Sequence, residues 1–241
     1  MPKYLWLVTV LLIGSTFFIL GCDETEQMME SVLTEPGTSV EDMVVDFPDP
    51  NLRVAVQGAL DLASGDAITL GMLQTLTQLD AWDREITDLT GLEQATQLKV
   101  ANLHNNAISD ISPLAGLTHL TELSLSLNEI SDISPLVGLT QLTELVLYEN
   151  QISDISPLAG LTQLIGLGLR DNQITDISPL AELTRLTVLD LYGNNITNIS
   201  PIVALVNLEF LFLQEAITDK KQLQSLLEKN PNLQINIDTN N

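Results

Sequence analysis

Five aspartates recur at intervals of 22 residues and form the most regular set of chemically active side chains in the sequence. They are Asp88, Asp110, Asp132, Asp154 and Asp176, and Asn198 stands at the next interval. Carboxylates stacked about 5 Å apart repel each other by roughly 0.8 kcal/mol per neighbour in water, so another interaction must offset this repulsion. Hydrogen bonds from backbone N–H groups of the adjoining turn would do so. Calcium between neighbouring copies is the alternative, but a strong calcium site takes about six or more oxygens, and no compact loop offers them.

Residue types that serve catalysis are sparse. The two histidines, His104 and His119, fall at different positions of the same 22-residue period, so we expect them on different faces. No phosphate-binding loop and no spacing typical of metal ligands is present. Hydrolysis of a glycosidic bond needs two carboxyl groups at a defined separation, which the repeat spacing does not supply. The sequence therefore predicts no enzyme activity, no cofactor and no metal, with an accessory subunit of an envelope enzyme as an alternative.

The element that positions all of these side chains is a repeated unit of 22 residues. Its apolar residues fall at positions 1, 4, 6, 11, 14, 17 and 20, and seven copies follow one another over residues 76–217. The copies begin at Leu76, Leu98, Leu120, Leu142, Leu164, Leu186 and Leu208. A repeat of this length predicts a solenoid in which stacked copies share one continuous core.

Each copy combines a short strand with a short helical turn. In the fourth copy, apolar and polar side chains alternate over residues 143–148, which is typical of a strand. Asn150 follows where the chain must bend, and its side chain can bond backbone groups that the bend leaves unpaired. Ser156 is a good N-cap and Pro157 suits the first helical position, so a 3-10 or short helical turn is expected there.

The consensus LxxLxLxxNxIxDISPLxGLT resembles the bacterial leucine-rich repeat of internalin type. The asparagines that hold this register are Asn106, Asn128, Asn150, Asn172 and Asn194, whereas Arg84 and Ala216 replace them in the end copies. The resemblance implies a curved leucine-rich repeat solenoid of the α/β class. Its mostly parallel sheet would line the concave side, with 3-10 turns on the convex side. The resemblance also favours protein binding over catalysis.

Caps are expected at both ends of the solenoid, because the last copies would otherwise expose the core. Over residues 47–75, Asp49 and Pro50 predict the start of a helix that ends at Gly65, and Thr69 predicts the start of a second short turn. Residues 218–241 predict a helix followed by a strand. In that helix Leu223, Leu226 and Leu227 would share one face, and in the strand Leu233, Ile235 and Ile237 would point inward.

The N-terminus is typical of an export signal. Residues 1–21 contain Lys3 and an apolar run that is shorter than the roughly 20 residues of a membrane-spanning helix. Residues 19–22 resemble a bacterial lipoprotein box, which implies that Cys22 is lipidated and anchors the chain to a membrane; an uncleaved anchor and a secreted form are the alternatives. Residues 22–46 are rich in acidic side chains and predict a flexible tether. The expected location is the bacterial cell envelope, in an outer or cytoplasmic membrane, facing the periplasm or the cell surface.

The charge of the chain restricts its partners. There are 32 acidic and 9 basic residues, with a formal net charge of −23, so nucleic acid is not expected as a partner. The charge would serve solubility at a crowded surface, or it would favour a basic or cation-bridged partner. Both alternatives are open at this point.

Residues at positions 3, 5 and 7 of each copy are not part of the predicted core and differ most between copies. They include the aromatic and arginine types that are enriched in protein interfaces. The residues predicted to bind a protein ligand are Trp82, His104, Glu122, Glu144, Tyr148, Arg170, Val188, Asp190, Tyr192, Phe210 and Phe212. Gly166 and Gly168 would leave room beside Arg170 for a protruding group of the ligand, and backbone exposure without a function is the alternative. The alternative is a merely solvated sheet whose tyrosines lie flat on their neighbours.

Together these features predict a lipid-anchored envelope protein, expected to be monomeric, that binds another protein through its concave sheet face. A structural spacer or scaffold without a dedicated ligand is the second hypothesis. The sequence does not identify the protein ligand.

Overall fold

The structure is a computed structural model that describes residues 39–214 and 220–238. Residues 40–241 form a compact unit of their own. The predictions for the signal peptide, for Cys22 and for most of the tether lie outside the described residues. Among the residues that are described, no helix has both the length and the apolar character needed to cross a membrane.

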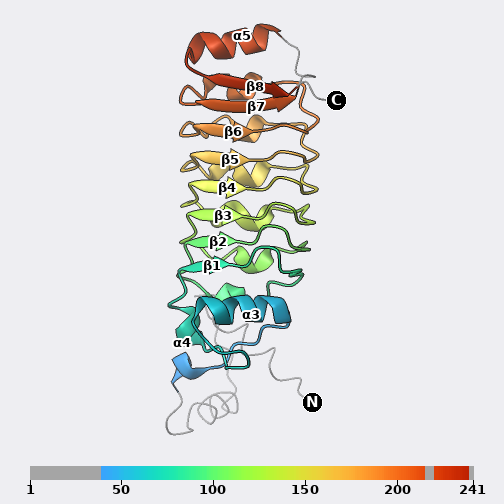
Figure 1. The fold of residues 1–241 in the computed structure, drawn as a ribbon. Coiled ribbons are helices and arrows are strands. Elements are labelled where there is room, and N and C mark those ends of the chain that lie inside the picture. The colour runs from blue at the N-terminus through green and yellow to red at the C-terminus, as the bar shows by residue number, and fades with distance from the viewer. Residues whose placement is uncertain (1–38, 215–219, 239–241) are drawn as a thin grey trace, which may run out of the picture. The chain divides into compact units, whose positions relative to one another are not determined.

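Eight parallel strands form one sheet in which chain order and spatial order are the same. They stack along the unit like the rungs of a ladder (Figure 1). The strands are β1 (Gln78–Asp80), β2 (Val100–Asn102), β3 (Glu122–Ser124), β4 (Glu144–Val146), β5 (Gly166–Gly168), β6 (Val188–Asp190), β7 (Phe210–Gln214) and β8 (Gln234–Asp238). From β1 to β7 each residue pairs with the residue 22 positions further on, for example Leu123 with Leu145. The predicted leucine-rich repeat solenoid is therefore confirmed.

Short 3-10 helices return the chain from one strand to the next. They are η2 (Leu92–Gln94), η3 (Ser112–Leu114), η4 (Ser134–Gly138), η5 (Ser156–Gly160), η6 (Ser178–Leu180) and η7 (Ser200–Ala204). From η3 onward each has proline in its first turn, where the fixed φ of proline suits a helix and its missing N–H is not needed. Neighbouring 3-10 helices also contact each other, so they form a second layer behind the sheet.

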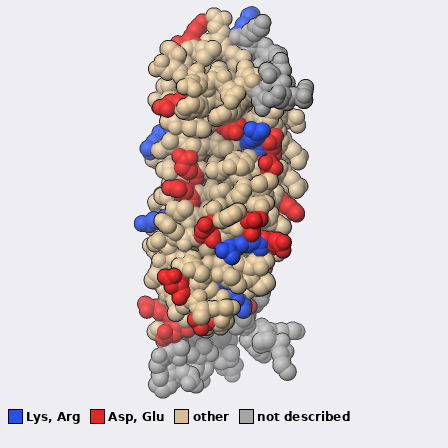
Figure 2. Space-filling model, viewed as in Figure 1, with Lys and Arg blue, Asp and Glu red and all other residues tan. Residues whose placement is uncertain are grey.

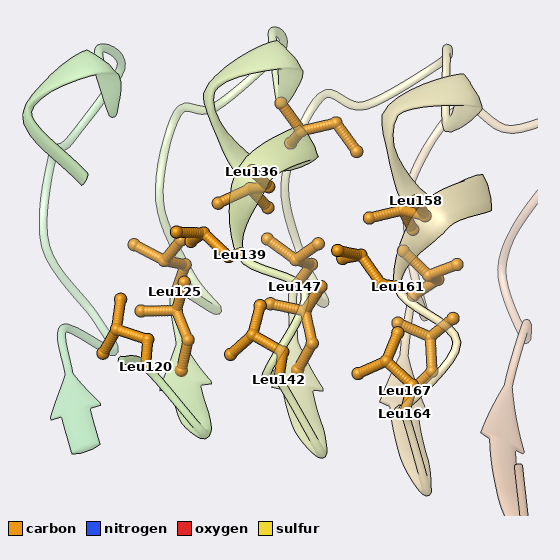
Figure 3. Packing of buried hydrophobic residues seen from close by; sticks show 14 of the residues in the cluster. Leu120, Leu125, Leu136, Leu139, Leu142, Leu147, Leu158, Leu161, Leu164 and Leu167 are labelled. Carbon is orange, nitrogen blue, oxygen red and sulfur yellow. The ribbon is translucent and has the colours of Figure 1, made fainter. Parts of the chain in front are cut away.

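The core lies between these two layers. Leu142 and Leu147 of the strand segments and Leu158 and Leu161 of the 3-10 segments are fully buried, and the preceding copy places Leu120, Leu125, Leu136 and Leu139 in the same way (Figure 3). The second to fifth copies have leucine at all four positions, and Ala81, Ala95 and Ile202 replace it in the first and sixth copies, so the rows merge into one continuous apolar core along the unit. No single copy encloses a core, so the stability resides in the contacts between copies.

The asparagine of each repeat fixes the bend after the strand. Asn150 donates through Nδ2 to the carbonyl oxygens of Leu125 at 3.0 Å and Leu147 at 3.1 Å. Its Oδ1 accepts from the N–H of Ile130, one copy earlier, at 3.0 Å. Asn128, Asn172 and Asn194 make the same set of bonds. These amides therefore replace the backbone pairing that the bend would lose, as expected.

The N-terminal cap consists of η1 (Val40–Asp42), α3 (Pro50–Ala59) and α4 (Leu70–Leu73). Asp49 caps α3, as predicted, since its Oδ1 accepts from the N–H groups of Asn51 and Leu52. Its Oδ2 also accepts from the N–H of Thr87 at 2.8 Å, which joins the cap to the first repeat. Thr69 likewise caps α4.

Two predicted boundaries at this end are wrong. Helix α3 ends at Ala59, well before Gly65, and Ala59 is exposed. The predicted tether over residues 22–46 extends too far, because residues 40–46 belong to the cap. Val44 forms a bridge with Thr69, and the N–H of Val45 donates to the carbonyl oxygen of Ile68 at 2.9 Å. Acidic composition alone does not show that a segment lacks backbone partners elsewhere in the chain.

The C-terminal cap consists of α5 (Lys220–Lys229) followed by β8, as predicted. Leu226 is fully buried and Leu223 packs against the core. Ile237 is 38% exposed, so the prediction that it points inward is wrong. Helix α5 packs against η7 with Leu226 buried, whereas Leu227 is 42% exposed and does not join it in the core.

Candidate protein-binding face

The strand face is defined here as the side chains at repeat positions 3, 5 and 7 of strands β1–β7 and of the residues that follow them. Positions 4 and 6 between them are buried; for example Leu123, Leu145 and Leu167 are at most 2% exposed. Because side chains alternate along a strand, positions 3, 5 and 7 point away from the core. All eleven predicted binding residues lie on this face and none is fully buried. Their role in binding stays a prediction.

The aromatic side chains at position 7 form the first part of the face. Trp82 is 52% exposed. On the next copies, the rings of His104 and Tyr148 approach each other edge to face, with 6.5 Å between their centroids. Ser126 lies between them in sequence and in the sheet, and it is fully buried. These two rings therefore contact each other across an intervening copy.

Two carboxylates lie next to each other at position 3. Glu122 and Glu144 pair in register across β3 and β4. Burial raises the pKa of Glu144, and the neighbouring charge of Glu122 raises it further. The carboxylate of Glu144 folds over Gly166, since a Cβ built on that glycine would lie 1.9 Å from Oε2. The absence of a side chain at residue 166 lets Glu144 lie across β5.

The opening predicted beside Arg170 is therefore already occupied. Glu144 covers Gly166, and a Cβ on Gly168 would lie 3.3 Å from Cδ1 of Tyr148. The prediction that the two glycines leave a free space is wrong, because long side chains of the preceding copy lean into it.

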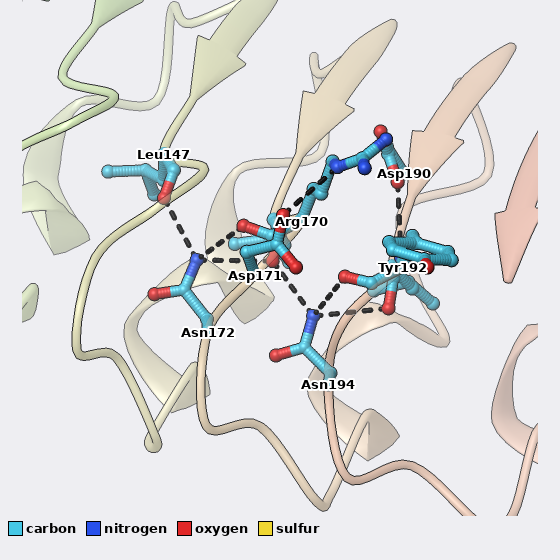
Figure 4. A network of polar contacts seen from close by, with 9 residues as sticks. Leu147, Arg170, Asp171, Asn172, Asp190, Tyr192 and Asn194 are labelled. Carbon is cyan, nitrogen blue, oxygen red and sulfur yellow. Dashed lines mark hydrogen bonds and ion pairs between the residues drawn. The ribbon is translucent and has the colours of Figure 1, made fainter. Parts of the chain in front are cut away.

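A polar cluster surrounds Arg170 near the C-terminal end of the face (Figure 4). Its Nε lies 3.0 Å from Oδ2 of Asp171, and its Cζ lies 4.4 Å from the ring centroid of Tyr192. Burial raises the pKa of Asp190, opposed by the N–H of Tyr192 and by the charge of Arg170. The guanidinium thus has both an ionic and an aromatic partner within the chain.

An apolar patch follows this cluster. Val188 and Phe210 pair in register across β6 and β7, and they are 37% and 38% exposed. Phe212 is half-buried beside Asp190. Val188 and Phe210 are not needed to fill the core, because the buried leucine and isoleucine rows already fill it.

The acidic character of the chain extends to the strand face. At positions 3, 5 and 7 there are four acids, Asp80, Glu122, Glu144 and Asp190, against one base, Arg170. Figure 2 shows acidic side chains more often than basic ones on the visible side of the unit. The strand face therefore carries a net negative charge.

The aspartate ladder lies away from the strand face, in the segments that lead to the 3-10 helices. Asp132 accepts the N–H of Ser134 through Oδ1 at 2.8 Å and its hydroxyl through Oδ2 at 3.0 Å. Asp110, Asp154 and Asp176 do the same with Ser112, Ser156 and Ser178. Asp88 accepts both the N–H and the hydroxyl of Thr90 through Oδ1. The backbone and then the hydroxyl bonds lower the pKa of Asp132 and Asp176. The expected hydrogen bonds are confirmed.

Other candidate sites are weaker. Within residues 39–214 and 220–238, no three His, Cys, Asp or Glu side chains are close enough to hold a metal ion. His119 contacts the carbonyl oxygen of Thr96 through Nδ1 at 3.0 Å, away from the strand face, which confirms that the two histidines lie on different faces. Shallow hollows at Leu223 and Leu227 of α5, and between the η7–β7 connection and the C-terminal cap, are open to solvent.

Sequence reasoning missed Ser126 on this face and Asp171 beside it. Ser126 was not singled out, because a serine at position 7 is inconspicuous until its aromatic neighbours are placed. Asp171 falls at position 8, outside the alternation, yet it contacts Arg170. Its φ of 51° is left-handed, as at Asn105, Leu127 and Glu149, and this conformation turns position 8 back toward the face.

The fold and the arrangement of its faces define the class of the protein. Five overlapping stretches match the family described as leucine-rich repeats in two copies, at residues 96–138, 118–160, 140–182, 162–204 and 184–226. Together they cover more than half of the chain. The chain belongs to the leucine-rich repeat family, and its fold supports interaction with other proteins in general.

The particular relatives are internalins. An internalin (inlF) of Listeria monocytogenes superposes with a TM-score of 0.73 and 37% identity, over 78% of this chain and 55% of that structure. Internalin J of the same species is 39% identical over 61 residues, which are 25% of this chain and 7% of that protein. A leucine-rich repeat protein of Leptospira interrogans shares the fold, with a TM-score of 0.53 and 24% identity over 68% of this chain and 50% of that structure. The two internalins support the internalin-type prediction, and this chain spans only part of each of the three relatives.

Proposed function

We propose that this chain is a lipid-anchored protein of the bacterial cell envelope that binds another protein through its strand face, and that it is not an enzyme. One observation carries the proposal. The strand face presents Trp82, Val188 and Phe210 to solvent at 52%, 37% and 38% exposure on a frame that does not need them. Exposed apolar and aromatic side chains on a rigid surface are typical anchors of protein interfaces.

The charge of the face supports a partner with a basic surface. Glu122 and Glu144 lie side by side without a basic residue at the paired positions of the neighbouring strands. Burial and mutual repulsion make the ionised pair unfavourable in the free protein. A cationic group of the partner would relieve this repulsion, which is a direct contribution to binding.

The test compares captured proteins between matched variants. A fragment of residues 39–241 is immobilised, because residues 40–46 belong to the cap and a shorter fragment would lose them. The binding variant carries Trp82→Ala, Val188→Ala and Phe210→Ala, the three exposed residues on which the proposal rests. The control carries Val137→Ala, Val206→Ala and His119→Ala, three exposed residues off the strand face.

We expect the native fragment and the control to capture the same proteins from envelope extracts, and the binding variant to lose them. All three fragments must melt at similar temperatures for the comparison to be valid. If the binding variant retains every captured protein, the strand face is not the binding surface.

The second hypothesis, a spacer without a dedicated ligand, is supported by the half-buried tyrosines. Tyr148 and Tyr192 lie against neighbouring side chains rather than standing free. Under this hypothesis the three fragments capture the same background proteins.

The anchoring part of the proposal rests on Cys22 and has its own test. Cys22→Ser is expected to move the protein from the membrane fraction to the soluble fraction, because one missing lipidation site removes the acyl chains that hold it. Retention of the variant in membranes would refute lipid anchoring and would leave the binding proposal unaffected.

A further inference from the structure

The row of position 7 side chains has a gap at Ser126. In chain order the row reads Trp82, His104, Ser126, Tyr148, Arg170, Tyr192 and Gln214. Serine is the smallest member and stands between two rings. Strands are about 4.8 Å apart, so the backbones that carry His104 and Tyr148 are separated by about 9.6 Å, since the copy of Ser126 lies between them.

The two rings close this gap in the structure. Their centroids are 6.5 Å apart, well below the spacing of their backbones, and the ring planes are inclined by 68°. Both rings therefore lean over Ser126, and both are half-buried. If the rings stood parallel at the spacing of their backbones, a planar group could stack between them, because two stacking contacts need roughly 7 Å (about 3.5 Å each).

The hydroxyl beneath the rings lacks a partner. Among the side chains that the structure describes, Ser126 Oγ is the one buried oxygen or nitrogen without a hydrogen-bond partner. A buried polar group without a bond is unfavourable compared with the same group bonded or hydrated. Elsewhere in the repeats, buried polar side chains such as Asn128 and Asn150 bond fully. The hydroxyl at 126 is therefore the exception in a frame that otherwise pairs its polar groups.

We propose that His104 and Tyr148 turn apart when the strand face binds its protein partner, and that an arginine side chain of that protein then stacks between the two rings over Ser126. The inference rests on the proposed function and names the chemistry of one contact. A guanidinium is planar, stacks on aromatic rings and donates several N–H groups, one of which would bond Ser126 Oγ. Its charge also suits a face with four acids and one base, and Glu149 directly follows Tyr148.

Other side chains fit this gap less well. A phenyl ring could stack between the rings but offers no donor to the hydroxyl. A carboxylate would enter an acidic face. Lysine carries the charge and donors, yet its ammonium group is not planar and does not stack in this way.

The test uses a defined probe and a local readout. The mature lipid-anchored protein, purified in detergent, is labelled with 3-fluorotyrosine, which reports on Tyr148 and Tyr192, since Tyr4 lies in the predicted signal peptide. Tyrosine-to-phenylalanine variants assign the two fluorine resonances. The probe is acetyl-Gly-Arg-Gly-amide, and the comparison peptides replace arginine with lysine or with citrulline, which keeps the planar shape but not the charge.

We expect the arginine peptide to shift the Tyr148 resonance saturably, while Tyr192, already stacked with Arg170, moves little. Ser126→Ala removes the acceptor and is expected to weaken binding about tenfold. Ser126→Leu fills the gap and is expected to abolish the shift. Ser124→Ala on the same copy is the matched control and should bind like the native chain.

Two results would overturn the inference. One is the absence of any saturable shift at Tyr148, and the other is equal binding of the lysine peptide or of Ser126→Leu. If the strand-face variant loses its captured proteins while the arginine peptide leaves Tyr148 unmoved, the inference fails and the proposed function stands. If capture is insensitive to the strand face, the proposed function itself fails.

Discussion

Replacing Asn150 by alanine tests how the repeat frame is held together. The side chain is 9% exposed and bonds groups in two neighbouring copies. Removal leaves the N–H of Ile130 buried without its acceptor, which costs about 1–3 kcal/mol. The carbonyl oxygens of Leu125 and Tyr148 lose their bonds from Asn150 Nδ2, but each keeps a second donor. Losing these two bonds therefore adds only about 1–2 kcal/mol. The free energy of unfolding is expected to fall by about 2–5 kcal/mol.

The assay combines global and local measurements. Urea unfolding followed by circular dichroism gives the change in free energy. Hydrogen exchange at the amide of Ile130, which lies 20 residues from the substitution, reports the lost bond directly. Asn195→Ala makes the same chemical change at an exposed position and is expected to change stability by less than about 0.5 kcal/mol.

Asn150→Asp separates the two halves of the interaction. An aspartate can still accept the N–H of Ile130, but it replaces the Nδ2 donor with an oxygen that faces the carbonyl groups of Leu125 and Leu147. We expect it to be at least as destabilising as alanine at neutral pH. The reasoning is refuted if alanine costs less than about 1 kcal/mol and the exchange of Ile130 is unchanged.

Three further predictions concern single side chains. Asp49→Ala should lower the free energy of unfolding by about 2–4 kcal/mol in urea, since an N-cap and a bond to the first repeat are lost together. Burial would raise the pKa of Asp49, but its backbone N–H bonds lower it; its contribution is therefore present above the unfolded pKa and is lost as pH falls through the folded one. Gly193→Ala should lower the free energy of unfolding by about 1–2 kcal/mol, because φ of residue 193 is 70° and a Cβ there would displace Asp171. The melting temperature of the variant measures this loss. Glu144→Gln should raise the melting temperature at pH 7 but not at pH 3: the folded pKa is raised by burial and by Glu122, so ionisation destabilises the fold as pH rises. An unchanged melting temperature at pH 7 would contradict this.

The repeat frame was predictable because each of its requirements has a sequence signature. The leucine rows, the asparagine after the strand and the serine–proline pair recur at fixed positions, and each position meets the same neighbours in every copy. The hydrogen bonds of the aspartate ladder followed from the need to offset repulsion between stacked carboxylates, and Asp132 shows the expected geometry. Periodicity therefore gave the register and the direction of every core side chain in residues 76–214.

The features that could not be predicted depend on contacts between positions that do not repeat. Residues 40–46 join the cap through backbone bonds to residues 68–70, and acidic composition gives no sign of such pairing. Glu144 fills the space over Gly166, although a glycine in the sequence indicates open room. The closure over Ser126 depends on the rotamers of two rings, which a list of residue types does not contain.

The frame and the strand face meet different physical requirements, and this difference governs how the face can be changed. The asparagine and aspartate rows bond the backbone groups at the bends, and the leucine rows fill the core. Side chains at positions 3, 5 and 7 are therefore needed neither for the bends nor for the core. Substitutions at Trp82 or Phe210 should therefore leave the melting temperature nearly unchanged. Tyr148 and Arg170 are exceptions. Tyr148 contacts His104 across an intervening copy and Arg170 contacts Tyr192 on the next copy, so their loss removes these contacts as well. A loss of binding at Trp82 or Phe210 without a loss of stability would thus be attributable to recognition alone.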